Sequence, residues 1–126
     1  MKPWKTIESK NLIEDLPWLK ISVEHVLLPN GKEIDNFYQI QLPEYAVIVA
    51  ETQERLIIME RQYKHAAGKV ILNLPSGYLN TNESPLDCAK RELLEETGFR
   101  AESWYHLGSL LVDGNRGCGK MHAFAA

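Results

Sequence analysis

The first third of the chain has a pattern of apolar and polar residues that predicts a β-hairpin. Residues 21–26 alternate between apolar and polar side chains, which is typical of a half-buried strand. The Pro-Asn-Gly sequence at 29–31 predicts a tight turn, because Asn and Gly tolerate a positive φ. A second strand is expected near residues 36–41, ended by Pro43. Residues 1–20 show no clear period of apolar and polar side chains.

Two short apolar runs follow, at residues 45–50 and 56–59, separated by a polar stretch at 51–55. Short runs rich in β-branched residues predict buried strands, here flanking a hairpin loop. The turn-rich stretch 113–119 is expected to form a flexible loop on the substrate side. Further strands are predicted over residues 70–74, 103–112 and 120–126.

A helix is predicted from Pro85 to about Thr97. Ser84 is a favourable N-cap, and Pro85 suits the first helical position, where a missing N–H costs nothing. Gly98 suits the position just after the helix, where a left-handed conformation is common. The expected apolar stripe consists of Leu86, Ala89, Leu93 and Leu94.

Length and composition predict a single domain over residues 1–126, because 44% hydrophobic and 25% charged residues are ordinary values for a folded protein. Fourteen Lys and Arg against seventeen Asp and Glu give a net charge of −3, which argues against a nucleic acid polymer as partner. No apolar run is long enough for a membrane span or a signal peptide, so we expect a cytoplasmic protein. Cys88 and Cys118 are expected to be reduced thiols.

Three carboxylates on the predicted helix indicate a functional site. Glu92, Glu95 and Glu96 lie on one arc about 100° wide at helical spacing. Their mutual repulsion, and the position of two of them at the negative end of the helix dipole, disfavour folding. A divalent cation would relieve both penalties. The alternative is a solvated acidic face paired with Lys90 and Arg91.

The residues around this cluster form a longer motif. They fit the pattern G-x5-E-x7-R-E-U-x-E-E-x-G-U, where U is apolar, through Gly77, Glu83, Arg91, Glu92, Leu93, Glu95, Glu96, Gly98 and Phe99. This is the Nudix box, over residues 77–99, and the chain resembles the Nudix hydrolases. The resemblance implies an α/β (α+β) fold, an α/β/α sandwich with a mixed β-sheet and N-terminal antiparallel strands. It also implies cleavage of nucleoside diphosphates linked to another moiety, with Mg²⁺ or Mn²⁺.

The residues of the motif have expected roles. Gly77 is expected to let the chain turn sharply and bring the Ser76 backbone carbonyl near the metal. Arg91 can hold a carboxylate through a bidentate pair. By the resemblance, the metal ligands are Glu92, Glu95 and Glu96, one of which also orients or deprotonates the attacking water. Glu83 is implied as a more distant partner of the metal.

Outside the box, the chain resembles the ADP-ribose and nucleotide-sugar pyrophosphatase branch of the family. Three segments carry this resemblance: Trp18-Leu19-Lys20 with the 28–31 turn, Arg61-Gln62-Tyr63-Lys64, and Leu74-Pro75-Ser76-Gly77. That branch implies a homodimer built through the N-terminal strands, here residues 1–42. It also implies a nucleobase-stacking aromatic, Trp18 or less strongly Phe37. The alternative for both aromatics is core or dimer packing.

Arg61 and Lys64 are implied to face the diphosphate or the terminal ribose, and the alternative for both is solvation. The branch commonly has Arg at 64 and Glu at 73, where this chain has Lys64 and Asn73. A lysine ammonium is a point charge and lacks the two parallel N–H donors with which an arginine guanidinium binds a phosphate or carboxylate. Asn73 removes a carboxylate that could serve the metal.

The implied function is hydrolysis of ADP-ribose, or a related nucleotide sugar, to a nucleoside monophosphate and a sugar phosphate. One alternative is a (d)NTP or dinucleotide pyrophosphatase of the same fold. A second is a Nudix module that binds a nucleotide sugar without cleaving it, and a third is a purely structural acidic helix. Because few residues follow Phe99, we also expect a C-terminally shortened domain with impaired activity.

Overall fold

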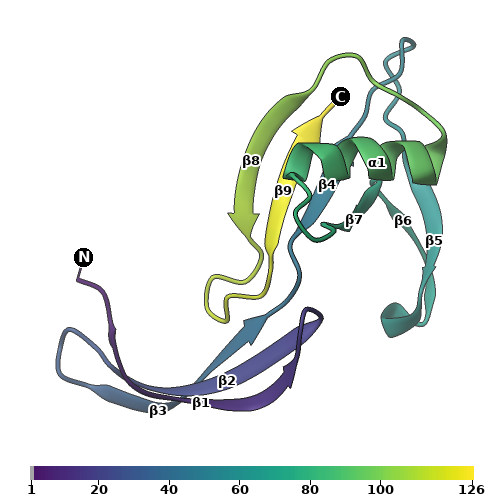
Figure 1. Ribbon diagram of the computed structural model, residues 1–126. Coiled ribbons are helices and arrows are strands. Elements are labelled where there is room, and N and C mark those ends of the chain that lie inside the picture. Colours follow the sequence, from purple (N-terminus) through teal and green to yellow (C-terminus); the bar gives the residue numbers. More distant parts are fainter. Residues whose placement is uncertain (1) are drawn as a thin grey trace. The chain divides into compact units, whose positions relative to one another are not determined.

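The computed structural model describes residues 2–126 as two compact units (Figure 1). The N-terminal unit comprises the chain through Pro43 together with Leu111–Gly119. The helix unit comprises Glu44–Leu110 together with Lys120–Ala126. Each unit has its own β-structure, and the Nudix box lies in the helix unit.

The N-terminal unit contains an antiparallel sheet of three strands, in the order β1-β2-β3. The strands are β1 (Lys5–Asp15), β2 (Leu19–Leu27) and β3 (Glu33–Gln41). The predicted hairpin between β2 and β3 is confirmed: Gly31 has a φ of 83°, and the Leu28 N–H donates to the Lys32 carbonyl at 2.8 Å.

Strand β1 lies in a part of the sequence that shows no clear period of apolar and polar residues. Every residue of β1 is exposed, so no buried face gives the sequence an alternating pattern. The pairing with β2 also shifts register between Thr6 and Glu8 and between Asn11 and Ile13. Each shift moves the following side chains to the other face, which removes any period of two.

The helix unit contains a mixed sheet in the order β7-β4-β9-β8. Its strands are β4 (Tyr45–Val49), β7 (Ser76–Tyr78), β8 (Tyr105–Leu111) and β9 (Lys120–Ala125). Strand β4 pairs with β7 antiparallel and with β9 parallel. A separate antiparallel hairpin joins β5 (Glu60–Lys64) to β6 (Lys69–Asn73) through a short 3-10 turn, η1 (His65–Ala67). The expected mixed sheet and α+β class are confirmed.

Helix α1 (Pro85–Thr97) has the predicted bounds. The Ser84 hydroxyl accepts from the Asp87 N–H at 3.1 Å, and Gly98 ends the helix with a φ of 76°. Figure 1 shows α1 beside β4 and β7, with both of which it makes contacts. The buried core between helix and sheet consists of Ala46, Ile48, Ala50, Cys88, Ala89, Leu93 and Phe124. Cys88 therefore belongs to the apolar face of the helix.

The predicted buried strand at residues 56–59 is wrong. This stretch forms one isolated bridge, between Glu51 and Ile57, and Leu56 is 64% exposed. Ile58 alone of the four packs against the core. The expected hairpin loop does form, since the Ile58 N–H donates to the Ala50 carbonyl at 2.9 Å and the Leu56 carbonyl accepts the Thr52 N–H at 2.8 Å, but the pairing ends there and the run is not a strand.

Within residues 2–126 there is one α-helix, and it is too short to cross a membrane. The described chain therefore supplies one helical layer, which covers one side of the mixed sheet.

Candidate functional site

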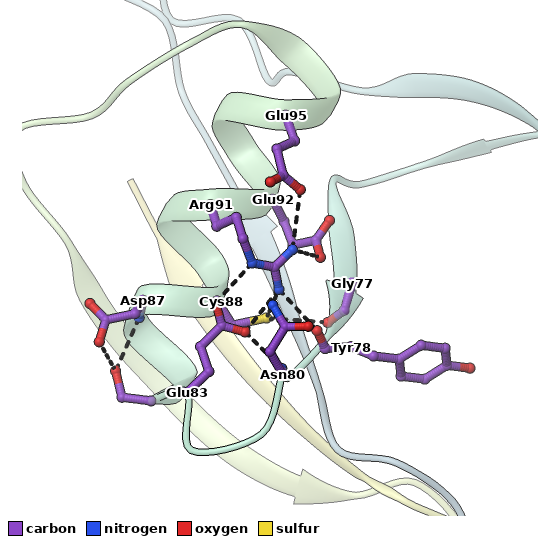
Figure 2. Close-up of polar contacts among 10 residues, drawn as sticks. Gly77, Tyr78, Asn80, Glu83, Asp87, Cys88, Arg91, Glu92 and Glu95 are labelled. Carbon is purple, nitrogen blue, oxygen red and sulfur yellow. Dashed lines mark hydrogen bonds and ion pairs between the residues drawn. The ribbon is translucent and has the colours of Figure 1, made fainter. Parts of the chain in front are cut away.

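The guanidinium of Arg91 is the centre of a dense polar cluster on α1. Its Nε and Nη2 each donate to the Glu83 carboxylate at 2.8 Å. Its Nη1 donates to Glu92 at 2.5 Å and to Glu95 at 3.2 Å, and its Nη2 also donates to the Tyr78 carbonyl at 3.0 Å. Figure 2 shows Glu83 on one side of the guanidinium, and Glu92 and Glu95 on another. One arginine thus holds three carboxylates of the box.

Glu83 is fixed from two directions. Besides the fork from Arg91, it accepts the Asn80 N–H at 2.8 Å. The hydrogen bonds from Arg91 lower the pKa of Glu83 to about 2, so the carboxylate is ionised at neutral pH. In return, the Glu83 hydrogen bonds raise the pKa of Arg91 above its ordinary value. The expected bidentate pair of Arg91 is therefore confirmed, with Glu83 as its partner.

Gly77 makes room for Glu92. A Cβ placed on Gly77 would lie 1.9 Å from Glu92 Oε1 and 2.0 Å from its carboxyl carbon. Gly77 lies within β7, paired with Ala46, and is not among the glycines with positive φ. The expected sharp turn at Gly77 is thus wrong: glycine is needed because a side chain from the helix occupies the space above the strand.

Glu96 points toward β7 and β5. Its Oε2 accepts the Ser76 N–H at 2.8 Å, and its Oε1 accepts from Gln62 Nε2 at 3.0 Å. Gln62 in turn accepts a hydrogen bond from Lys64. The Ser76 N–H therefore contacts the carboxylate cluster, and the approach of the Ser76 carbonyl to a metal stays a prediction.

A fifth carboxylate, Glu60 on β5, belongs to the same neighbourhood. Burial raises the pKa of Glu60, and the negative charges of Glu96 and Glu92 raise it further, against the opposing effect of Lys64. Within residues 2–126, Glu60 Oε1 is buried without a hydrogen-bond partner. Sequence reasoning missed both Glu60 and Gln62. The sequence signal that could have found them is the alternation of side chains between the two faces of a strand, which places Glu60, Gln62 and Lys64 on one face of β5.

The donor set fits a divalent cation. The side chains of α1 and β5 gathered here offer several carboxylate oxygens, and hard oxygen ligands are those that Mg²⁺ and Mn²⁺ prefer. The described side chains are not arranged as a preformed metal group, since no set of three such ligands converges in residues 2–126. Glu92 and Glu95 contact Arg91, whereas Glu96 contacts Ser76 and Gln62. Binding a cation would require these side chains to turn from their present partners.

The expected substrate residues belong to both units. Trp18 follows β1 in the N-terminal unit and its side chain is 58% exposed. Phe37 in the same unit packs edge-on against Trp4, at 5.6 Å between ring centroids, which agrees with the packing alternative. In the helix unit, Lys64 shares the face of β5 with Gln62, whereas Arg61 lies exposed on the opposite face.

Comparison with known proteins gives two family matches. The NUDIX domain matches residues 41–122, and the nucleoside diphosphate sugar hydrolase N-terminal domain matches residues 4–40. Among solved structures, a protein described as an ADP compounds hydrolase superposes with a TM-score of 0.85 at 20% identity. That alignment covers 100% of this chain and 68% of the other, and it supports the fold.

Curated relatives carry several names. A methanol dehydrogenase activator of Bacillus methanolicus is 35% identical over 98 residues, which are 78% of this chain and 52% of the relative. An ADP-ribose pyrophosphatase of Bacillus subtilis is 33% identical over 102 residues, 78% of this chain and 55% of the relative. The chain thus spans about half the length of the curated relatives it matches. Because the NUDIX match covers more than half of the chain and includes the whole Arg91 cluster, this chain belongs to the Nudix family.

Proposed function

We propose that this chain hydrolyses the pyrophosphate bond of a nucleoside diphosphate linked to a sugar, with ADP-ribose as the first substrate to test. The products would be AMP and ribose 5-phosphate. The Arg91 cluster supports the reaction class, because Arg91 holds three of the four carboxylates of an intact Nudix box together. The nucleotide-sugar choice is supported by the N-terminal match at residues 4–40 and by the name of the Bacillus subtilis relative.

The proposed cofactor is Mg²⁺ or Mn²⁺, held by Glu92, Glu95 and Glu96, with Glu83 and the Ser76 backbone behind them. When bound, such a cation supplies positive charge against the charge that develops on the phosphoryl oxygens. The donor chemistry supports this choice, since the cluster is rich in carboxylates and Arg91 is its central cation.

The chain's own residues have separate tasks in this proposal. Glu83 anchors Arg91, and Arg91 keeps Glu92 and Glu95 oriented. Glu95 or Glu96 accepts a proton from the attacking water. The water oxygen then bonds to one phosphorus, the bond from that phosphorus to the bridging oxygen breaks, and the bridging oxygen leaves with the other phosphate.

The substrate side of the proposal uses the residues that the family resemblance implies. Trp18 stacks on the nucleobase, while Lys64 and Arg61 bind the diphosphate or the ribose. Residues 1–42 form a homodimer interface, which is supported by the exposed apolar side chains of β1, such as Ile7 and Ile13. A cytoplasmic location also belongs to this proposal.

A substrate panel tests the proposal. The chain with Mg²⁺ is offered ADP-ribose, another nucleotide sugar, a dinucleotide, and a (d)NTP, with AMP and phosphate as readouts. We expect ADP-ribose or the other nucleotide sugar to give nucleoside monophosphate. Turnover of the (d)NTP or dinucleotide alone would replace the proposed substrate class. Tight binding of ADP-ribose without turnover would instead indicate a binding module.

A further inference from the structure

The β5–β6 hairpin holds two complementary polar atoms, one acceptor and one donor, that lack hydrogen-bond partners in residues 2–126. Glu60 and Asn73 face each other in the antiparallel register, as the first pair of the hairpin. Glu60 Oε1, an acceptor, and Asn73 Nδ2, a donor, are both buried, and neither has a hydrogen-bond partner in the described chain from Lys2 onward. Buried polar atoms without partners are uncommon in native proteins, and each calls for an explanation.

The surroundings of Glu60 are those of the carboxylate cluster. Gln62 lies two residues after Glu60 on the same face of β5, and its Nε2 donates to Glu96 at 3.0 Å. Glu96 also accepts the Ser76 N–H at 2.8 Å, so β5, β7 and α1 meet at this carboxylate. Lys64, the cation on this face of β5, donates to Gln62. Within residues 2–126, Glu60 Oε1 is therefore a buried acceptor atom without a hydrogen-bond partner, although Lys64 and Gln62 interact with the Glu60 carboxyl group as a whole.

We propose that Glu60 supplies a further carboxylate oxygen to the divalent cation of this site, beside Glu92 and Glu96, and that Asn73 holds the Glu60 carboxylate in place. The inference rests on the cation of the proposed function. It explains why an acidic residue is kept in a half-buried position beside other carboxylates, where folding alone disfavours it. It also gives the Asn73 amide a matching acceptor across the hairpin.

Metal binding without substrate tests the inference. Mn²⁺ binding is measured by the loss of the free Mn²⁺ signal in electron paramagnetic resonance, on the wild-type chain and on Glu60→Gln. We expect Glu60→Gln to bind Mn²⁺ at least about tenfold more weakly, as is usual when a ligand or its close support is lost. Asn73→Ala should weaken binding by a smaller factor. Glu102→Gln, an exposed carboxylate of the same unit, is the matched control and should bind as the wild type does.

Thermal stability separates a metal role from a structural one. In EDTA, Glu60→Gln should melt at or above the wild-type temperature, because it removes a buried charge from a cluster of like charges. With Mn²⁺ added, the wild type should gain stability by mass action and Glu60→Gln should gain much less. A clear fall of the melting temperature of Glu60→Gln in EDTA would indicate a structural role and overturn the inference.

The remaining outcomes distinguish this inference from the proposed function. If the wild type binds Mn²⁺ and hydrolyses ADP-ribose while Glu60→Gln binds Mn²⁺ equally well, the inference alone is overturned. If the wild type binds no Mn²⁺, both are overturned. If Glu60→Gln weakens Mn²⁺ binding but no substrate of the panel is hydrolysed, the role of Glu60 is supported and the proposed reaction is not.

Discussion

The Glu83 carboxylate accepts two hydrogen bonds from a single guanidinium, from Nε and Nη2 of Arg91, each at 2.8 Å. This fork fixes the plane of Arg91 and directs Nη1 toward Glu92 and Glu95. Glu83 contacts neither of those carboxylates through any hydrogen bond recorded in residues 2–126, so it acts on them through Arg91.

Replacing Glu83 by Gln tests this fork. The variant loses a charged acceptor for two N–H groups, so the free energy of unfolding should fall by about 1–3 kcal/mol. Urea unfolding followed by circular dichroism measures the change. Glu102→Gln, which removes an exposed carboxylate, should stay within about 0.5 kcal/mol of the wild type. Equal stability of Glu83→Gln and the wild type would show that the fork contributes nothing.

The same pair predicts a dependence of stability on pH. The pKa of Glu83 is lowered from its ordinary 4.5 to about 2, because Arg91 stabilises the ionised form. Its contribution is therefore complete above about pH 5 and is lost as the pH falls from 4.5 toward 2. The difference in unfolding free energy between wild type and Glu83→Gln should shrink over that range. A difference that stays constant from pH 7 to pH 3 would contradict the assignment.

Gly77→Ala should separate activity from stability. The new Cβ would lie 1.9 Å from Glu92 Oε1, but the displaced group is the end of a flexible side chain. We expect a small change in melting temperature and a loss of roughly a hundredfold in any metal-dependent hydrolysis, because Glu92 moves. Gly114→Ala is the stability control, since nothing lies within 4 Å of its added Cβ. Unchanged hydrolysis in Gly77→Ala would show that the position of Glu92 is unimportant.

The two cysteines should differ in reactivity. Both are free, and burial raises the pKa of Cys88 to about 11, with a further increase from the charge of Glu83. Because the thiolate is the reactive form, iodoacetamide at pH 8 should label the part-exposed Cys118 first. Cys88 should react only after unfolding in urea. Mass spectrometry of the peptides follows both sites, and equal labelling rates in the folded protein would refute the burial of Cys88.

Local signals were sufficient for the helix and for part of the site. The caps Ser84 and Gly98 act within a few residues of chain, so the helix bounds could be predicted from sequence. Helical spacing places Arg91 and Glu95 one turn apart, and the two side chains do contact each other. The Nudix box supplied the family.

The remaining features depend on contacts between distant residues. Strand β1 has no buried face and is defined by its ladder to β2, with two register shifts. The contact of Gln62 with Glu96 joins residues 34 apart in sequence, and no local pattern predicts it. We expected Asn73 to remove a carboxylate from the metal site. The hairpin register, which the sequence alone does not reveal, places Glu60 opposite Asn73.

The most direct test of the central proposal is product analysis with ADP-ribose in ¹⁸O-labelled water, comparing the wild-type chain with Glu96→Gln, with and without Mg²⁺. For the wild type with Mg²⁺, we predict AMP and ribose 5-phosphate in equal amounts, with a single ¹⁸O in one of the two products. Without Mg²⁺ we predict no products, and with Mg²⁺ the rate of Glu96→Gln should be at least about a hundredfold lower than that of the wild type. Undiminished hydrolysis by Glu96→Gln, or equal hydrolysis without any divalent cation, would contradict the proposal.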